Sequence, residues 1–303
     1  MQIEQGQPLI RHPVVRHPLD RPIQNGESPC WDAGRQALYF VDMAAPAVLR
    51  LDPASGALQA WKMPAPIGSM GLCPDERAIV ALKTGVHLFD FETGRLELVA
   101  DPERGRPDNR LNDGKVGPDG SFWVGSMSSA SPQRADSRLF RIAADGTCTP
   151  MVVEGLTTSN GLAWSPDGRL MYHSDSRGKF LQVFDHDPQT GAIANARRLR
   201  DFDEAEGRPD GAAMDVEGYY WSAGVSAGCI NRIAPDGRIV EKYLLPVAAP
   251  SMPCFGGPDL RTLYVTSLST DRTGTAEHGT VLSFDVDVAG VRVARFGEPL
   301  AGR

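Results

Sequence analysis

A short β-rich unit recurs along the 303-residue chain, and this repeat limits the possible folds more than any other feature. Each unit begins with small and apolar residues that lead into a Pro-Asp-Gly-like turn and an aromatic segment, as in "NGLAWSPDGRLMYHSDS". Two alternating apolar segments around an Asp/Pro/Gly turn follow, as in "GVHLFDFETGRLELV", a pattern typical of a β-hairpin. Six units align in this way, and the last ends in the hairpin-like "TVLSFDVDVAGVRVARF".

Four-stranded units repeated every 40–50 residues or so are typical of β-propellers. We therefore predict an all-β fold, a six-bladed β-propeller with four-stranded blades, with residues 1–303 forming a single domain. The N-terminal segment "PVVRHPL" precedes the first full unit. We expect it to close the last blade as the outer strand, because ring closure removes an exposed sheet edge.

Composition and missing motifs exclude several function classes. The formal net charge is −7, so no basic surface for nucleic acid is indicated. Apolar runs are too short to span a bilayer, and the N-terminus lacks the features of a secretory signal. The five cysteines have no CxxC spacing, and nucleotide-binding, serine-hydrolase and zinc-protease motifs are absent. We expect a cytoplasmic protein with reduced thiols and no nucleic-acid, membrane or protein partner.

Alignment of the units on their turns selects one residue per blade. The six residues are Glu27, Gly68, Asn112, Asn160, Asp210 and Met252, at successive spacings of 41, 44, 48, 50 and 42 residues. The first strand of each propeller blade lines the central channel, so these positions converge at one mouth of that channel. Four of the six carry a side-chain oxygen.

Such a ring of oxygens indicates an axial metal site. Glu27 and Asp210 would repel each other in a narrow channel, and desolvation would increase the cost. A divalent cation removes both problems, and carboxylate and carboxamide oxygens suit Ca²⁺, Mg²⁺ or Mn²⁺. Taken singly, each residue is also an ordinary turn residue at the start of a strand. The shared register across four blades favours the metal site.

Four segments extend the argument to a known family: "GESPCWD", "RLNDGKVGPDGSFWVGSM", "SNGLAWSPDGRLMYHSDS" and "RPDGAAMDVEGYYW". Together they resemble the SMP-30/gluconolactonase/luciferin-regenerating-enzyme (LRE) family of sugar lactonases, and the resemblance covers essentially the whole chain. It implies that Glu27, Asn160 and Asp210 hold one divalent metal ion (Ca²⁺, Zn²⁺, Mg²⁺, Mn²⁺ or Fe²⁺) and that Arg110 and Asn112 contact substrate. Some members place a carboxylate after the G-x-M of this motif to contact sugar hydroxyls, but here the sequence reads "SMSSASPQ".

The function implied is that of a metal-dependent hydrolase in carbohydrate metabolism that opens sugar lactones, namely aldonolactones of pentose or hexose type. The metal would polarise the lactone carbonyl and lower the pKa of a bound water, and Asp210 would act as the general base. Two alternatives stay open. One is a hydrolase with broader lactone or ester specificity, and the other is a non-catalytic propeller scaffold with a structural ion. Three or four protein ligands leave an ion open to solvent, which favours catalysis.

Overall fold

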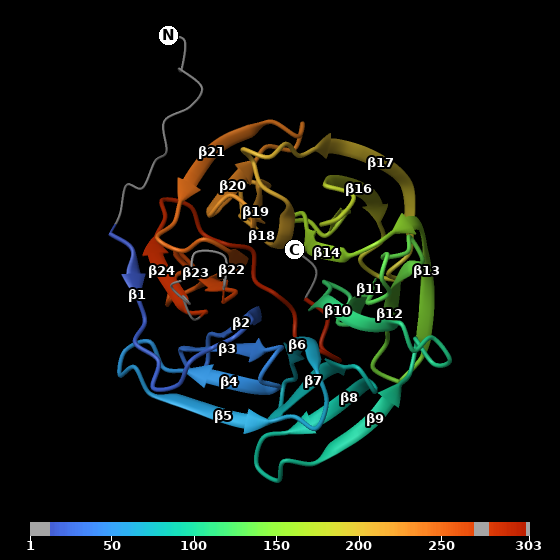
Figure 1. The fold of residues 1–303 in the computed structure, drawn as a ribbon, viewed down its shortest axis with the longest axis horizontal. Coiled ribbons are helices and arrows are strands. Elements are labelled where there is room, and N and C mark those ends of the chain that lie inside the picture. The colour runs from blue at the N-terminus through green and yellow to red at the C-terminus, as the bar shows by residue number, and fades with distance from the viewer. Residues whose placement is uncertain (1–12, 270–278, 301–303) are drawn as a thin grey trace.

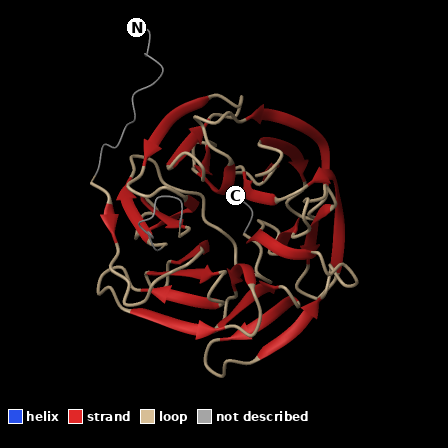
Figure 2. Ribbon diagram, in the orientation of Figure 1, coloured by secondary structure: helices blue, strands red, loops and turns tan. Residues whose placement is uncertain are grey.

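The computed structural model describes residues 13–269 and 279–300. This part of the chain contains 24 β-strands and no helix (Figure 2), and so no helix that is long and apolar enough to span a membrane. The N-terminal residues 1–12, on which the expectation of no secretory signal partly rests, lie outside the described range.

The strands form six blades. The first contains β2 (Gly26–Asp32), β3 (Ala37–Asp42), β4 (Ala47–Leu51) and β5 (Leu58–Lys62). The second contains β6 (Ile67–Leu72), β7 (Arg77–Leu82), β8 (Gly85–Asp90) and β9 (Leu96–Ala100). The third contains β10 (Asn109–Val116), β11 (Phe122–Ser128), β12 (Ser137–Ile142) and β13 (Cys148–Leu156). The fourth contains β14 (Ser159–Trp164), β15 (Leu170–Asp175), β16 (Phe180–His186) and β17 (Ile193–Asp201). The fifth contains β18 (Pro209–Met214), β19 (Tyr220–Gly224), β20 (Cys229–Ile233) and β21 (Ile239–Leu244). The sixth contains β22 (Pro250–Gly256), β23 (Thr262–Ser267), β24 (Val281–Asp285) and β1 (Val15–Arg16).

The blades are arranged in a ring, with the first strand of each nearest the centre (Figure 1). All strand pairs within the blades are antiparallel, and the inner strands of neighbouring blades contact one another around the ring. The prediction of a six-bladed β-propeller with four-stranded blades is confirmed.

The N-terminal strand β1 is the outer strand of the sixth blade. Val15 pairs with Ser283 and Arg16 with Leu282, and the His17 N–H donates to the Val281 oxygen at 2.9 Å. The chain therefore joins its beginning to its end through backbone hydrogen bonds in one sheet. The expectation of a second strand within "TVLSFDVDVAGVRVARF" is wrong, because that edge of β24 is already occupied by β1 and the chain leaves the sheet after Asp285.

Residues 286–300 form what we call the C-terminal strap. The strap crosses the centre of the ring (Figure 1) and bonds to the far ends of inner strands. The Val291 N–H donates to the Met214 oxygen at 2.8 Å, and the Phe296 N–H donates to the Leu72 oxygen at 2.8 Å. Ala294 and Phe296 are buried in the apolar cluster between the second and third blades. The strap therefore lies over the mouth at which the inner strands end.

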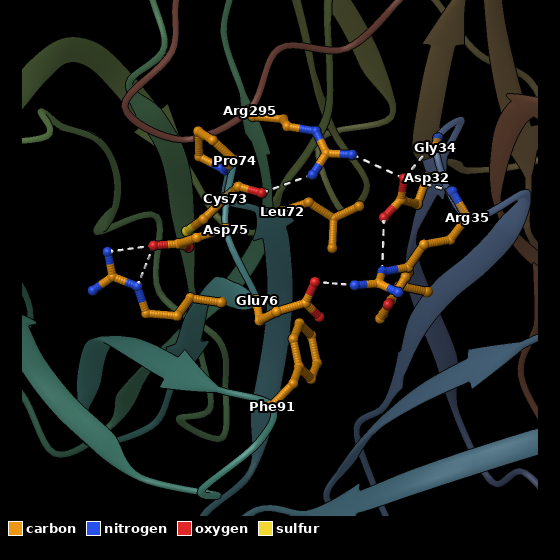
Figure 3. Close-up of a pocket in the computed structure, with 12 residues that line it drawn as sticks. Asp32, Gly34, Arg35, Leu72, Cys73, Pro74, Asp75, Glu76, Phe91 and Arg295 are labelled. Atoms are coloured by element: carbon orange, nitrogen blue, oxygen red, sulfur yellow. Dashed lines mark hydrogen bonds and ion pairs between the residues drawn. The ribbon is translucent and has the colours of Figure 1, made fainter.

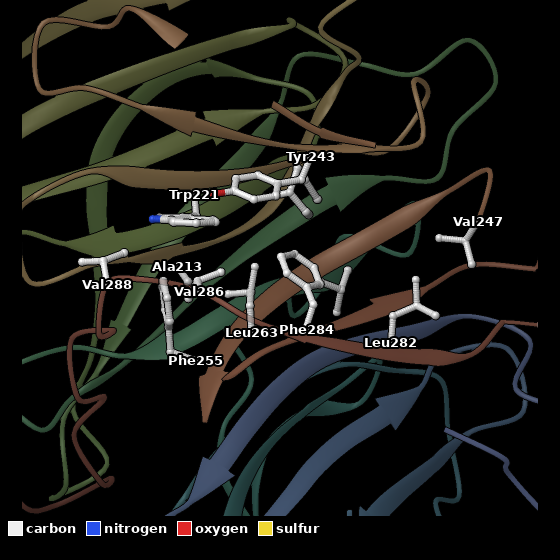
Figure 4. Close-up of a cluster of buried hydrophobic side chains, with 13 residues drawn as sticks. Ala213, Trp221, Tyr243, Val247, Phe255, Leu263, Leu282, Phe284, Val286 and Val288 are labelled. Carbon is white, nitrogen blue, oxygen red and sulfur yellow. The ribbon is translucent and has the colours of Figure 1, made fainter. Parts of the chain in front are cut away.

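Apolar side chains fill the spaces between blades. Between the fifth and sixth blades, the Trp221 ring stacks on Tyr243 at 5.3 Å and meets Phe255 edge-on at 5.4 Å (Figure 4). Leu263 and Phe284 of the sixth blade belong to the same buried cluster. This packing fixes each inner strand relative to its neighbours, which a site built from several blades requires.

Truncation of Trp221 tests this interblade packing. Trp221→Ala should lower the free energy of unfolding by about 3–5 kcal/mol, because it leaves a cavity in a fully buried cluster. Urea denaturation followed by circular dichroism measures the change. Leu98→Ala is the control, since that side chain is 53% exposed, and it should shift the free energy by about 0.5 kcal/mol or less. Equal effects of the two substitutions would contradict the assignment.

Candidate active site

The four oxygen-bearing ring residues all lie near the beginning of an inner strand. Glu27, Asn160 and Asp210 are the second residues of β2, β14 and β18, and Asn112 is the fourth residue of β10. The two other ring positions carry no oxygen: Gly68 is in β6, and the buried Met252 is in β22. The inner strands bring all six positions to the same mouth, opposite the C-terminal strap.

Each inner strand is irregular at this level. The register with the second strand shifts at or directly beside every ring position, in all six blades. β-Bulges bend a strand and redirect its side chains, and they are common next to active sites. Asn112 and Asp210 lie within such shifts, between Leu111 and Gly114 and between Pro209 and Ala212.

Two carboxylates face each other across this mouth. Burial, followed by the charges of Asp210 and Asp113, raises the pKa of Glu27 well above its usual range. Burial and the charge of Asp113 raise the pKa of Asp210 to about 8. The guanidinium of Arg110 opposes both shifts, and burial in turn lowers its own pKa. The three groups therefore form one electrostatic unit.

A chain of hydrogen bonds connects the third, fourth and fifth blades. Arg110 Nη1 donates to Asn112 Oδ1 at 3.0 Å, and Asn112 Nδ2 donates to Asn160 Oδ1 at 3.2 Å. Asn160 Nδ2 donates to Ser176 Oγ at 2.6 Å, and Ser176 Oγ donates to the Pro209 oxygen at 2.5 Å. The chain ends at the residue before Asp210. It fixes both amide orientations and turns the Asn160 oxygen toward Asn112.

Gly161 in the "SNG" segment is required by a close approach of two blades. Its φ is +62°, and a Cβ atom there would lie 2.3 Å from the Tyr220 hydroxyl and 2.4 Å from Ser174 Oγ. The Tyr220 hydroxyl donates to the Gly161 oxygen at 2.7 Å. This contact holds the start of β14 against the fifth blade, which places Asn160 beside Asp210.

Sequence reasoning missed two charged residues of β10 beneath the ring, the buried Asp113 and the partly buried Lys115. Asp113 is 4% exposed, and neither of its carboxylate oxygens has a hydrogen-bond partner in the described part of the chain. Burial raises the pKa of Asp113, and the charge of Lys115 is the largest effect that opposes this shift. The Lys115 ammonium reaches across the channel and donates to the Ala212 oxygen of the fifth blade. The sequence signal that could have found Asp113 is its place as the second residue of "NDG", directly after Asn112.

The ring residues fit a hard divalent cation. In the described ranges, no three His, Cys, Asp or Glu side chains gather closely enough to hold one ion. The donors would therefore be the carboxylates of Glu27 and Asp210 with the amide oxygen of Asn160, and Asn112 would be next to them. An all-oxygen set with two charges suits Ca²⁺, Mg²⁺ or Mn²⁺ better than Zn²⁺, which commonly takes nitrogen and sulfur ligands. The two raised pKa values come first from burial and then from repulsion by neighbouring carboxylates, and such an ion would offset both.

A separate pocket of about 330 Å³ lies at the opposite side, between the first two blades and the strap (Figure 3). Arg295 of the strap donates to Asp32 Oδ1 at 2.9 Å and to the Cys73 oxygen at 2.8 Å. Arg35 pairs with Glu76, and Arg77 pairs with Asp75. All three guanidinium groups there have carboxylate partners. This pocket is therefore internally neutralised, and it shares no residue with the ring.

The pKa values predict that cation binding depends on pH. Since Asp210 holds a proton below about pH 8 when no ion is present, an ion must displace that proton. Affinity for Ca²⁺ should therefore rise by at least about tenfold from pH 6 to 8 and level off above that range. By the same linkage, the ion-free protein should lose stability as pH rises toward 8. Calorimetric titration of chelator-treated protein measures the affinity.

Two variants control this experiment. Asp210→Asn should flatten the pH dependence, whereas Asp236→Asn should retain it, because Asp236 is an exposed turn residue paired with Arg238. An affinity that does not change with pH would contradict the coupling between Asp210 and the ion.

Comparisons with known proteins agree with the fold. The chain is 38% identical over 276 residues to 6-deoxy-6-sulfogluconolactonase of Pseudomonas putida, covering 91% of this chain and 94% of that protein. It is 35% identical over 247 residues to regucalcin of Xenopus laevis, covering 80% and 82%. The solved structure of a calcium-binding protein, regucalcin, from Agrobacterium tumefaciens superposes with a TM-score of 0.85 at 27% identity, covering 91% and 95%. Residues 25–269 match the sequence profile of the SMP-30/Gluconolactonase/LRE-like region, and the chain belongs to this family, as the sequence motifs predicted.

Proposed function

We propose that this protein is a metal-dependent hydrolase that opens sugar lactones to the free sugar acids. The observation that carries the proposal is the convergence of two buried carboxylates, Glu27 and Asp210, with Arg110 and two amides at one mouth of the channel. Scaffold residues would not need such a costly arrangement, since buried like charges destabilise a fold unless a ligand compensates for them.

Names of relatives support the substrate class and the ion. The Pseudomonas putida relative is named as a lactonase of a 6-sulfonated gluconolactone. The Agrobacterium tumefaciens relative is named as a calcium-binding protein. We accordingly place the substrate among the aldonolactones of pentose or hexose type, and the ion among the hard divalent cations, with Ca²⁺ as the first candidate.

The proposed roles follow from where each side chain lies. Glu27, Asn160 and Asp210 would hold the ion, which when bound would polarise the lactone carbonyl and lower the pKa of a water molecule. Arg110 presents fixed donors at the mouth, and its bond to Asn112 holds that amide in place beside Asn160, where both residues would contact substrate. Asp210 is buried next to this amide chain and would accept the proton of the attacking water.

A panel of neutral aldonolactones tests the activity. We expect chelator-treated protein to be inactive on arabinono-, xylono-, galactono- and gluconolactone, and one or more divalent ions to restore acid release, followed with a pH indicator. The rate constants rank both sugar and ion. Stoichiometric ion uptake without hydrolysis of any lactone would instead favour a different ester substrate or a non-catalytic scaffold.

Two substitutions separate ion binding from substrate binding. Asp210→Ala should abolish turnover, by a factor of about 10³ or more, and should weaken ion binding at the same time, because one carboxylate serves both roles. Asn112→Ala should lower turnover by about 10- to 100-fold while the ion remains bound in stoichiometric amount. Asp236→Ala is the control and should match the wild type. Full activity of Asp210→Ala would refute its assignment, and loss of the ion in Asn112→Ala would make Asn112 a fourth ligand.

A further inference from the structure

A second ring of residues lies outside the first. Residues two positions apart in an extended strand lie on the same face, displaced by roughly 6.6 Å. The residues two positions before the oxygen ring are Asn25, Pro66, Arg110, Thr158, Arg208 and Pro250. Since the inner strands begin at this mouth, the second ring lies between the first ring and solvent. It holds two arginines, in the third and fifth blades, with Thr158 of the fourth blade between them.

The backbone of Arg208 is fixed in this position. The Val225 N–H donates to the Arg208 oxygen at 3.0 Å, and the Arg208 N–H donates to Ser226 Oγ at 3.0 Å. The first bond continues the ladder of β18 and β19 by one residue, and the second ties the Arg208 backbone to a side chain of the following turn. The side chain is partly buried, and its charge acts on Asp210, as the lowering effect on the Asp210 pKa shows.

The Arg208 guanidinium has no ion-pair partner in the part of the chain that the structure describes. Its charge also acts on Glu204, but that exposed carboxylate is already paired with Lys179. Unpaired arginines are uncommon at partly buried positions, because guanidinium groups are normally matched to carboxylates or phosphates.

Thr158 supplies a second unused donor. It is 7% exposed, and its hydroxyl has no hydrogen-bond partner among the described residues. Its backbone is fully engaged, because its N–H donates to Asp175 Oδ2 at 3.1 Å and its oxygen accepts from the Ser176 N–H at 3.1 Å. A buried hydroxyl without a partner carries an energetic cost of about 1–3 kcal/mol unless a ligand satisfies it.

The charges around the channel mouth call for an anion once the ion is present. Among the groups whose charges act on one another here, three carboxylates, those of Glu27, Asp210 and Asp113, are matched by three cationic groups, those of Arg110, Arg208 and Lys115. The buried carboxylates of Asp42 and Asp175 also lie beside the second ring, where they accept hydrogen bonds from the backbone N–H groups of Asn25 and Thr158. A divalent cation adds two positive charges to the six interacting groups. The loop after the G-x-M motif adds no carboxylate to offset this charge, since "SMSSASPQ" contains none. Asp136, which follows the loop, pairs with Arg106, and Asp108, which precedes β10, pairs with Arg134.

We infer that Arg208, together with Thr158 and Arg110, forms an anion subsite, and that the preferred lactone carries an anionic group (sulfonate, phosphate or carboxylate) remote from the lactone carbonyl. This inference rests on the proposed function, because it places the reacting carbonyl at the first ring. The spacing of one strand repeat between the rings is comparable to the extent of a hexose ring with its exocyclic carbon. Arginine suits such groups because its planar donors bind two oxygens of a sulfonate, phosphate or carboxylate at once.

The kinetic test compares four hexonolactones: gluconolactone, 6-phosphogluconolactone, 6-deoxy-6-sulfogluconolactone and the carboxylate-bearing glucarolactone. The wild type should have a kcat/KM at least about tenfold higher for one of the anionic lactones than for gluconolactone, and the preferred one identifies the group. Arg208→Gln should lower kcat/KM for that lactone about 10- to 100-fold more than for gluconolactone. Thr158→Val should have a smaller effect in the same direction.

Controls distinguish the subsite from general effects of charge and folding. Arg169→Gln removes the same charge from an exposed turn at the end of β14, far from this mouth, and should change neither value. Arg208→Lys should recover part of the preference, because it restores the charge without the planar donors. A wild type that favours gluconolactone, or an Arg208→Gln variant that loses activity equally on all four lactones, would overturn the inference.

A binding measurement separates this inference from the proposed function. In calorimetry, 6-phosphogluconate or 6-deoxy-6-sulfogluconate, each with a second anionic group at C6, should bind more tightly than gluconate. Arg208→Gln should weaken this tighter binding about tenfold or more. If no lactone is hydrolysed but this difference is present, the subsite stands and the proposed function fails. If gluconolactone is hydrolysed but no added anion improves binding, the subsite fails and the proposed function stands.

Discussion

The burial of two neighbouring carboxylates, Glu27 and Asp210, is the physical constraint on which the rest of the site depends. Two carboxylates in a desolvated channel are tolerated only if neighbouring strands cannot separate, since small outward movements would relieve the repulsion. The propeller provides this rigidity through the apolar layers between blades and through the backbone bonds of β1 to β24, which connect the ends of the chain. Below about pH 8 a proton on Asp210 relieves part of this repulsion, and a cation that displaces the proton takes over that role. Until a cation binds, the positive charges of Arg110, Arg208 and Lys115 offset part of the negative charge of the carboxylates at the mouth.

Much of this arrangement could be predicted, because residues that occupy equivalent places in successive repeats lie at the same level of successive propeller blades. Once the units were aligned on their turns, Glu27, Asn112, Asn160 and Asp210 shared one register, and the structure places them at one mouth. Their local sequences, such as "NDG" and "SNG", are those of turns, yet each lies inside or beside a bulged strand. Bulges use the same residues as turns for the same reason, the need for backbone conformations that glycine tolerates. The turn-like composition and the site therefore have a single cause. The assignment of roles to these residues stays a prediction.

Other features could not be read from the chain, because they depend on contacts across the ring. "VRVARF" alternates like a strand, but alternation reports only that one side is buried, and the C-terminal strap buries Ala294 and Phe296 over the mouth of the channel instead. The outer strand of that blade came from the other end of the sequence. Asp113 and Lys115 were equally hidden: a charged pair two residues apart reads as surface, and only the path of Lys115 to Ala212 shows that it spans the channel.

The two mouths of the channel differ in electrostatics as well as in access. At the strap, Arg35, Arg77 and Arg295 are each matched by a carboxylate, so their charges serve the fold (Figure 3). At the ring, the carboxylates are too close together and Arg208 has no ion pair among the described residues, so the charges there are poorly matched without ligands. Poorly matched buried charges cost stability. The fold neutralises its charges at the strap, and it gains nothing from leaving charges unmatched at the ring unless ligands bind there and match them. A cation at the first ring and an anion at the second would do so in order along the axis. A negatively charged sugar lactone with its carbonyl inward is the kind of molecule that meets both requirements.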